Sequence, residues 1–379
     1  MATRHEGRQD ATGGDTAAAP PATQARPGPA GRGAPVGRAF IGSFTHAGGR
    51  GVTAASVDPA TGALAITGTT DAVADPSFLA LAPQGTVLYA VSETEEGAVA
   101  AFDTTSGPVP RLLSAPVPSG GSGPTHLACA SGHVVTAHYG SGSVSALSVR
   151  PGGSLRGVSG LVQHEGRGPD PERQAGPHAH QVVPAPGGRL LLAVDLGTDS
   201  VRVHALDPAT GALTPRGGTP LRPGSGPRHL AFHPAGRHVY VLAELTPTLT
   251  VCRWNPRGGT LVPVGEVPVR PGAGESGAAY PSGVAVAPDG RFVWAAVRGD
   301  DTLAVLAVDG DGERLTPVAH VPCGGRWPRD LTVDPGGRRL YVANERSGDV
   351  TWFDIDPATG VPSPAGSVSV PAATCVVLG

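Results

Sequence analysis

Three arginines, one histidine and one glutamate in this sequence are of types that could act together on an anionic substrate. These residues are His178, Arg228, Glu244, Arg298 and Arg329. Three guanidiniums near one cavity would repel each other, so they imply a ligand that carries a carboxylate or phosphate group. Glu244 beside Arg228 should keep a lowered pKa and stay ionised. His178 can titrate near neutral pH and serve as general base or acid.

A repeat of about 50 residues must position these side chains. Each copy opens with a proline that follows Gly, Asp, Tyr or Trp and precedes a short apolar run. These prolines are Pro76, Pro124, Pro177, Pro227, Pro281 and Pro328. Four short runs rich in Val, Leu and Ala, bounded by Gly, Pro and Asp, follow in each copy and are typical of β-strands. Four antiparallel strands per repeat predict the blade of a β-propeller.

The two ends of the repeat array complement each other. Residues 39–73 supply strands but lack the proline-led first strand, whereas residues 371–378 supply that strand and nothing after it. The last strand should therefore complete the first blade and hide the sheet edges that an open β-solenoid would expose. We expect an all-β, seven-bladed propeller over residues 38–379. Residues 1–37, rich in Ala, Gly, Pro, Thr and Arg, are expected to form a disordered extension.

Equivalent positions of the blades should form rings around the central channel. The residues that follow the motif proline are Ser77, Thr125, His178, Arg228, Ser282 and Arg329. The turns after the second strands carry Thr94, Tyr139, Leu196, Glu244, Arg298 and Glu345, each preceded by Glu93, His138, Asp195, Ala243, Val297 or Asn344. These positions vary while the framework repeats, as a binding site requires. We expect His178, Glu244 and Arg228 to be catalytic, and the substrate to be bound by Arg298, Arg329, His180, Asp195 and His138.

Composition excludes several classes of function. The net charge of −3 gives no reason to expect nucleic acid or an anionic membrane as partner. The chain has no Lys, which excludes lysine Schiff-base chemistry and a P-loop lysine. His178 and His180 could share a metal on one strand face, but no H-E-x-x-H motif or third clustered ligand accompanies them. We expect no metal, no cofactor and a cytoplasmic monomer with a small anionic substrate.

The motifs resemble the lactonase family of seven-bladed propellers, which includes bacterial propeller-type 6-phosphogluconolactonases and fungal carboxy-muconate lactonizing enzymes. The resemblance rests on Gly176-Pro-His178, Gly226-Pro-Arg-His-Leu-Ala-Phe-His-Pro234, Glu244-Leu245, Pro288-Asp-Gly-Arg291, Arg298-Gly299 and Pro328-Arg-Asp330, with Ile41–His46 and Thr374–Leu378 at the ends. It implies that His178, Arg228, Glu244, Arg298 and Arg329 surround the active cleft. The sixth repeat departs from the family pattern at Ser282–Val286, Val297 and Asp300, so that wall of the pocket is altered.

The resemblance implies metal-independent hydrolysis of a sugar-acid lactone. The arginines would bind the acid or phosphate and stabilise the oxyanion, while His178, or Glu244 acting through it, would deprotonate water. One alternative is a cycloisomerase that forms a lactone from a muconate-type dicarboxylate held by the same arginines. Another is a non-catalytic propeller that binds a ligand or a protein, which the altered sixth repeat favours. A metal-dependent gluconolactonase would need ligands that the sequence does not show.

Overall fold

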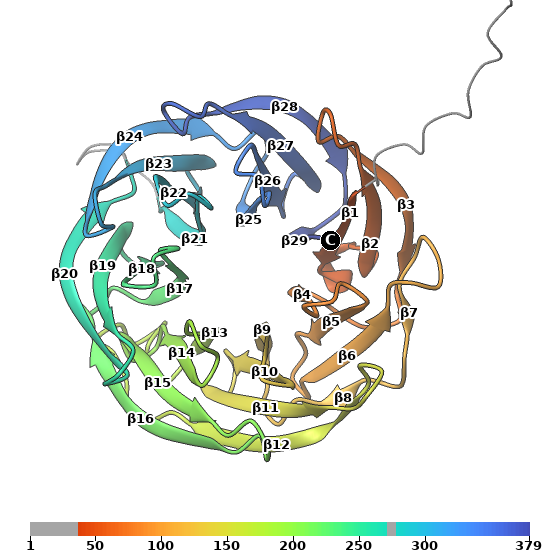
Figure 1. Ribbon diagram of the computed structural model, residues 1–379, viewed down its shortest axis with the longest axis horizontal. Helices are drawn as coiled ribbons and strands as arrows, with labels where there is room; N and C mark the ends of the chain where they lie inside the picture. Colours follow the sequence, from red (N-terminus) through yellow and green to blue (C-terminus); the bar gives the residue numbers. More distant parts are fainter. Residues whose placement is uncertain (1–36, 271–277) are drawn as a thin grey trace, which may run out of the picture. The chain divides into compact units, whose positions relative to one another are not determined.

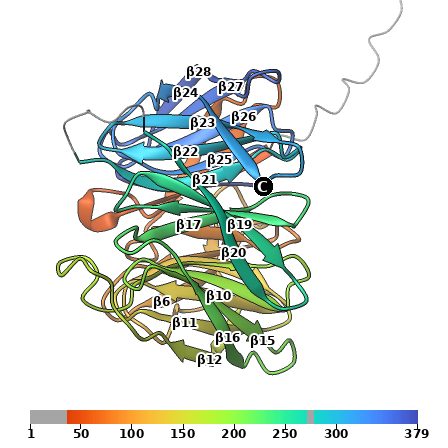
Figure 2. The ribbon, with the colours of Figure 1, turned by 90° about the vertical axis from the view of Figure 1, so that its left-hand side faces the viewer.

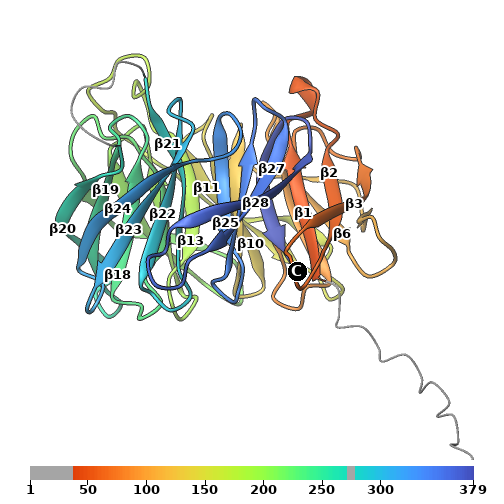
Figure 3. The same ribbon diagram turned by 90° about the horizontal axis from the view of Figure 1, so that it is seen from above.

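The computed structural model describes residues 37–270 and 278–379, in which seven antiparallel sheets surround a common axis (Figure 1). The predicted seven-bladed propeller is confirmed. The extension predicted over residues 1–37 lies outside the described residues except for Gly37, which begins the first strand. A short 3-10 helix, Thr45–Ala47, projects from one face of the ring (Figure 3). Within the described residues, no helix is long and apolar enough to cross a membrane.

Each blade is one sheet, ordered from the channel outwards in the following strands. Blade 1 contains β29 (Ala373–Leu378), β1 (Gly37–Ser43), β2 (Val52–Val57) and β3 (Leu64–Thr70). Blade 2 contains β4 (Leu79–Leu81), β5 (Val87–Ser92), β6 (Ala98–Asp103), β7 (Arg111–Leu112) and β8 (Val117–Pro118). Blade 3 contains β9 (Pro124–Ala130), β10 (His133–His138), β11 (Ser143–Val149) and β12 (Leu155–Gln163).

The other four blades follow the same order, and edge-on views show their strands running between the two faces of the ring (Figures 2 and 3). Blade 4 contains β13 (Ala179–Pro184), β14 (Leu190–Asp195), β15 (Ser200–Leu206) and β16 (Leu213–Pro220). Blade 5 contains β17 (Pro227–Phe232), β18 (His238–Ala243), β19 (Thr248–Asn255) and β20 (Thr260–Pro268). Blade 6 contains β21 (Tyr280–Val286), β22 (Phe292–Arg298), β23 (Thr302–Asp309) and β24 (Arg314–Pro322). Blade 7 contains β25 (Pro328–Val333), β26 (Arg339–Asn344), β27 (Asp349–Ile355) and β28 (Pro362–Ser369).

The end of the chain closes the ring as the sequence predicts. Strand β29 pairs antiparallel with β1, and Ile41 lies opposite Val376. Both side chains are buried in a cluster that also contains Ala343 and Val350 of blade 7. The closing strand therefore completes the sheet of blade 1 and also the apolar interface between blades 7 and 1.

Blade 2 departs from the predicted four strands because its outer strand is divided. The short strands β7 and β8 both pair with β6, at different places along it. The segment that contains them includes Pro108, Pro110, Pro116 and Pro118. Proline has no N–H to donate to a sheet, so a continuous outer strand cannot form here.

A repeated hydrogen bond joins neighbouring blades. An aromatic side chain of the second strand donates to the carbonyl of a glycine in the turn between the third and fourth strands of the next blade. The donor–acceptor pairs are Tyr89–Gly153 at 2.9 Å, Tyr240–Gly312 at 2.9 Å, Trp294–Gly360 at 2.8 Å and Tyr341–Gly62 at 2.9 Å. Burial raises the pKa of Tyr341 to about 12, so its hydroxyl stays protonated and remains a donor.

The glycine in this contact cannot carry a side chain. Gly62 has a φ of +71°, and a Cβ atom there would lie 2.2 Å from the Cδ of Arg339 and 2.9 Å from the hydroxyl of Tyr341. Only glycine combines the left-handed backbone with this close approach. The contact between Tyr341 and Gly62 spans the closure of the ring, since it joins blade 7 to blade 1.

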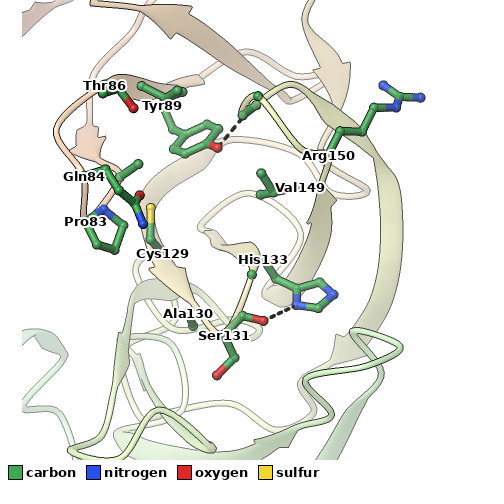
Figure 4. A pocket seen from close by; sticks show the side chains of 15 residues that line it. Pro83, Gln84, Thr86, Tyr89, Cys129, Ala130, Ser131, His133, Val149 and Arg150 are labelled. Atoms are coloured by element: carbon green, nitrogen blue, oxygen red, sulfur yellow. Dashed lines mark hydrogen bonds between the residues drawn. The ribbon is translucent and has the colours of Figure 1, made fainter.

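A groove beside the contact of Tyr89 with Gly153 lies between blades 2 and 3, away from the central channel (Figure 4). Its wall includes Cys129, His133 and Arg150. A groove lined by corresponding turns lies between blades 6 and 7. Because the same groove recurs at another interface, we attribute it to the packing of blades. Neither groove contains a residue predicted for the site.

We expect Tyr341→Phe to lower the free energy of unfolding by about 1–3 kcal/mol, because the buried carbonyl of Gly62 would lose its donor. Urea unfolding of the full chain measures the change. Removal of an exposed hydroxyl on the outer strand of the same blade, in Ser363→Ala, should change stability by less than about 0.5 kcal/mol. Equal effects of the two substitutions would show that the contact does not stabilise the closure.

Candidate functional site

A β-bulge in the inner strand of most blades directs one side chain into the channel. The pairing of the first strand with the second skips a single residue in blades 1, 3, 4, 5 and 7, and skips Ser282 and Gly283 in blade 6. Bulges re-aim side chains and are common beside active sites. The single skipped residues are Thr374, Thr125, His180, Arg228 and Arg329, and all five line a small central cavity.

This register corrects the sequence analysis in blade 4. The bulged residue there is His180, whereas alignment on the motif proline placed His178 in this ring. Pro177 precedes the first paired residue, Ala179, by two positions, while Pro227 is itself the first paired residue of blade 5. His178 therefore belongs one position earlier, at the rim of the channel.

The carboxylate of Glu244 is the centre of the charged part of the site. Its Oε2 lies 2.7 Å from Nη2 of Arg298 and 3.1 Å from Nε of Arg228, and its Oε1 lies 2.6 Å from Nη2 of Arg173. Burial alone would raise the pKa of Glu244, but these guanidiniums outweigh it and hold the pKa at about 2. Three cations share one carboxylate, so positive charge is left in excess beside the cavity.

Arg228 is the most buried of these cations, with 3% of its side chain exposed. Its Nη1 donates to the carbonyl oxygen of Ser282 at 2.5 Å. Burial, together with the charge of Arg298, lowers the pKa of Arg228 to about 9, so the guanidinium is still charged at neutral pH. Arg298 is oriented by a bond from its Nε to the carbonyl oxygen of Tyr280 at 3.0 Å.

Arg173 was not predicted from the sequence. It lies in the connection between β12, which ends at Gln163, and β13, which begins at Ala179. The next residue, Gln174, is fully buried and donates to the carbonyl of Leu196 and to the carboxylate of Asp199, both at 2.8 Å. This anchor holds the connection in blade 4 while Arg173 reaches Glu244 in blade 5. No local pattern signals a contact between residues 71 positions apart.

Arg329 lies in the same cavity but has its own counter-charges. Its Nη1 is 2.9 Å from a carboxylate oxygen of Glu345, and its Nη2 is 3.9 Å from Glu93. Its guanidinium also lies over the ring of Phe44, 4.5 Å from the centroid. The predicted arginines are thus brought to one channel, with Arg228 and Arg298 sharing Glu244 and Arg329 balanced separately.

His178 lies at the rim with its ring orientation fixed. Its Nδ1 is 2.7 Å from the carbonyl oxygen of Tyr139, and the two rings stack with centroids 4.4 Å apart. A carbonyl only accepts, so Nδ1 carries the proton and Nε2 of the neutral ring offers a lone pair. The backbone N–H of His178 donates to the buried carboxylate of Asp195 at 2.9 Å, and that carboxylate also pairs with His164 at 2.6 Å.

Three neutral histidines form the inner part of the channel. The ring of His229 lies 5.3 Å from that of His180 and 5.8 Å from that of His126, measured between centroids. Burial and the charge of Arg228 lower the pKa of all three histidines, in the case of His126 to about 3. His138 is not among the residues that line the cavity; its Nδ1 contacts Ser143 at 3.1 Å, and burial lowers its pKa to about 4. Within residues 37–270 and 278–379, no group of three or more His, Cys, Asp or Glu side chains is arranged to hold a metal ion.

Asp330 is a further carboxyl group in the cavity that the sequence analysis did not select. It follows Arg329 in the motif of blade 7 and, like His229, lines the cavity. Burial raises its pKa to about 7, against the opposing effects of the Leu331 N–H and of Arg228 and Arg329. A carboxyl group that titrates near neutral pH is unusual and occurs most often at functional sites.

Comparison with known proteins places the whole propeller in one family. A family model described as "Lactonase, 7-bladed beta-propeller" matches residues 38–378. A 6-phosphogluconolactonase of Bacillus subtilis (strain 168) is 33% identical over 346 residues, which cover 89% of this chain and 97% of that protein. The solved structure of a putative 6-phosphogluconolactonase from Bacteroides fragilis NCTC 9343 has a TM-score of 0.84 at 28% identity and covers 91% of this chain and 98% of its own. A periplasmic gluconolactonase from Pseudomonas aeruginosa has a TM-score of 0.82 at 29% identity and covers 90% of this chain and 99% of its own.

We expect Glu244→Gln to lower the free energy of unfolding by about 3 kcal/mol or more, because the buried guanidiniums would lose their shared counter-charge. Thermal and urea unfolding measure the change. Glu266→Gln breaks a half-exposed ion pair with Arg222 and should cost less than about 1 kcal/mol. A Glu244 variant as stable as the Glu266 variant would contradict this account of the cluster.

We expect Asp330→Asn to reduce the dependence of stability on pH. The folded protein raises the pKa of Asp330 from 3.8 to about 7, so between these values it binds a proton that the unfolded chain releases. The contribution of this group to stability is therefore complete below pH 3.8 and is lost as the pH rises towards 7. Between pH 5 and pH 8 the variant should lose less unfolding free energy than the wild type, by about 1 kcal/mol or more.

The exposed Asp71 offers a matched control for this measurement. Asp71→Asn should keep the wild-type change in unfolding free energy between pH 5 and pH 8. If Asp330→Asn also keeps it, the carboxyl of Asp330 is already ionised at pH 5.

Proposed function

The chain belongs to the lactonase family of seven-bladed β-propellers, and on this basis we propose that it hydrolyses the ring ester of a sugar-acid lactone at the mouth of its central channel. The observation that carries the proposal is the excess of guanidinium charge around Glu244, together with a histidine of fixed tautomer. This histidine stacks on Tyr139, whose hydroxyl accepts a hydrogen bond from Arg173 of the cluster. Such a site favours an anionic substrate and a reaction in which negative charge develops on oxygen.

Arg228 and Arg298 bind the substrate and stabilise the transition state in this proposal. Both guanidiniums are buried and held in place by Glu244 and by backbone carbonyls. Attack on the lactone carbonyl moves negative charge onto its oxygen. Charged donors that are already oriented in a poorly solvated site stabilise that oxygen without reorganising. Arg329 supplies a third contact to the acid or phosphate group of the substrate.

His178 acts as the general base. Its Nε2 takes a proton from water as the water oxygen bonds to the carbonyl carbon, and the imidazolium then returns the proton to the ring oxygen as the C–O bond breaks. The product is the open-chain hydroxy acid. His180 is a weaker base, because burial and nearby arginines hold its pKa far below the ordinary value.

Glu244 has a different role in this proposal from the one predicted from the sequence. Its pKa of about 2 makes its carboxylate a poor proton acceptor at neutral pH. We therefore treat it as a positioning residue that holds Arg228 and Arg298. Asp195 positions His178 by accepting a hydrogen bond from the His178 backbone N–H. His138 does not line the cavity, so we give it no contact with the substrate.

The two kinds of similar enzyme suggest which lactones to test. The Bacillus subtilis relative is named a 6-phosphogluconolactonase and the Pseudomonas aeruginosa structure a gluconolactonase. We propose 6-phosphogluconolactone as the first substrate and D-glucono-δ-lactone as the second. A phosphorylated substrate is consistent with the proposed location in the cytoplasm, and we propose a monomer that acts without a metal or cofactor.

The purified protein should accelerate release of acid from 6-phosphogluconolactone, measured by pH-stat against the spontaneous rate in the same buffer, before and after dialysis against a chelator. Decay of both lactones at the buffer rate would refute the proposed function. Loss of activity on chelation would refute its metal independence. Ring closure of a muconate-type dicarboxylate, followed by ultraviolet absorbance, would instead support the cycloisomerase.

We expect His178→Gln to lower kcat by about 100-fold or more while the protein stays folded, because it removes the proton acceptor at Nε2. The control is His133→Gln, since the Nδ1 of His133 also contacts a backbone carbonyl, that of Ser131, but its ring lies in the groove between blades 2 and 3. The control should keep the wild-type kcat. Full activity in the His178 variant would exclude this residue as the base.

A further inference from the structure

A tryptophan with a strained backbone stands at the rim of the channel. In blades 1, 3, 5 and 7 the residue before the first paired position of the inner strand has a positive φ. Glycine takes this position in blades 3 and 5, at Gly123 and Gly226, whereas blade 7 has Trp327 with a φ of +64°. A bulky side chain in the left-handed region is a clear outlier and is retained mainly where the surroundings impose it.

Blade 5 shows that the fold does not need an indole at this position. The N–H of Gly226 donates to Asp199 at 2.7 Å, and the N–H of Trp327 donates to Asp301 at the same distance. The two backbones are thus held in the same way, and only the side chain differs. The strain at Trp327 must therefore be explained by what its ring does.

Two arginine guanidiniums lie over the ring of Trp327. The guanidinium carbon of Arg346 lies 3.4 Å from the ring centroid, and that of Arg298, which also binds Glu244, lies 5.5 Å from it. In blade 5 the counterpart of Arg346 is Leu245, whose side chain occupies the space beside Gly226. Blade 7 thus replaces a leucine beside a glycine with an arginine stacked on a tryptophan.

Arg346 is exposed, and within the described residues its guanidinium has no carboxylate partner. The neighbouring Glu345 is already paired with Arg329. Stacking uses the flat face of a guanidinium and leaves the N–H groups at its edge free for a planar or tetrahedral oxyanion. Because Arg298 and Arg346 contact one ring, a small substrate held by Arg298 can reach Arg346 with its other end.

We propose that Arg346, held against Trp327, recognises a phosphate monoester on the substrate and gives this site its preference for a phosphorylated lactone. The inference rests on the proposed lactonase activity for its biological meaning. The binding site itself does not depend on that activity, because the hydroxy-acid product carries the same phosphate.

The test compares kcat/KM for 6-phosphogluconolactone and D-glucono-δ-lactone in the full chain. We expect Arg346→Gln to lower kcat/KM for the phosphorylated lactone by about 10- to 100-fold. The kcat/KM for D-glucono-δ-lactone should stay within about twofold of the wild-type value. The matched control is Arg326→Gln, because Arg326 is an exposed arginine at the same rim without a ring contact. Both kcat/KM values of this variant should stay within about twofold of those of the wild type. Equal losses on both lactones, or no loss, would overturn the proposal.

A second variant tests the role of the indole. Trp327→Gly should fold, because glycine has the same backbone conformation in blade 5, and it should lose the same preference because Arg346 is no longer held in place. A Trp327→Gly variant that keeps the wild-type preference would show that the ring does not position Arg346.

Binding of the products separates the two proposals. Isothermal titration of the wild type should give tighter binding of 6-phosphogluconate than of gluconate, by about 10-fold or more, and Arg346→Gln should remove the difference. If this holds while neither lactone is hydrolysed, the lactonase proposal fails and the phosphate site stands. If inorganic phosphate competes as well as 6-phosphogluconate, the site takes free phosphate, and the proposed preference for a phosphorylated substrate is wrong.

Discussion

The buried carboxylate of Glu244 is the interaction on which the site depends, because it holds guanidiniums that come from three parts of the propeller. Arg228 comes from the inner strand of blade 5, Arg298 from the end of the second strand of blade 6, and Arg173 from the connection that enters blade 4. One carboxylate cannot balance three cations, so the arrangement costs folding free energy unless an anion is bound. Such a cost at the mouth of a channel is expected of a site that is completed by its ligand.

The propeller builds this site without disturbing its scaffold. The second and third strands carry the apolar core, while in five of the seven blades a bulge in the first strand turns a single side chain towards the axis. The backbone forms the same single-residue bulge whether the bulged residue is Thr125, His180 or Arg228. Stability and chemistry are therefore carried by different positions, and the residues at the axis can differ between blades while the ring stays closed.

The fold could be predicted from the sequence because its signals are local: a proline before each inner strand, short apolar runs and glycine turns. The closure was predictable because the two ends lack complementary strands. The arrangement of the site was harder to predict from the sequence. Alignment on Pro177 placed His178 in the ring that His180 occupies, since nothing in the sequence shows that this proline lies two residues before the strand pairs. Arg173 was missed because it lies outside the repeat, and its partner is distant in the chain.

The corrected register also places His178 apart from the histidines that lie deeper in the channel. His178 and Trp327 occupy the same position in blades 4 and 7, one residue before the bulged strand begins its pairing. Further in, burial and Arg228 keep His126, His180 and His229 neutral, so they add no charge to an already cationic channel. A histidine that exchanges a proton must stay outside that group, because a cation beside it would weaken it as a base. His178 lies at the rim, apart from these three histidines, and its stacking on Tyr139 and its hydrogen bond to the Tyr139 carbonyl keep its ring oriented.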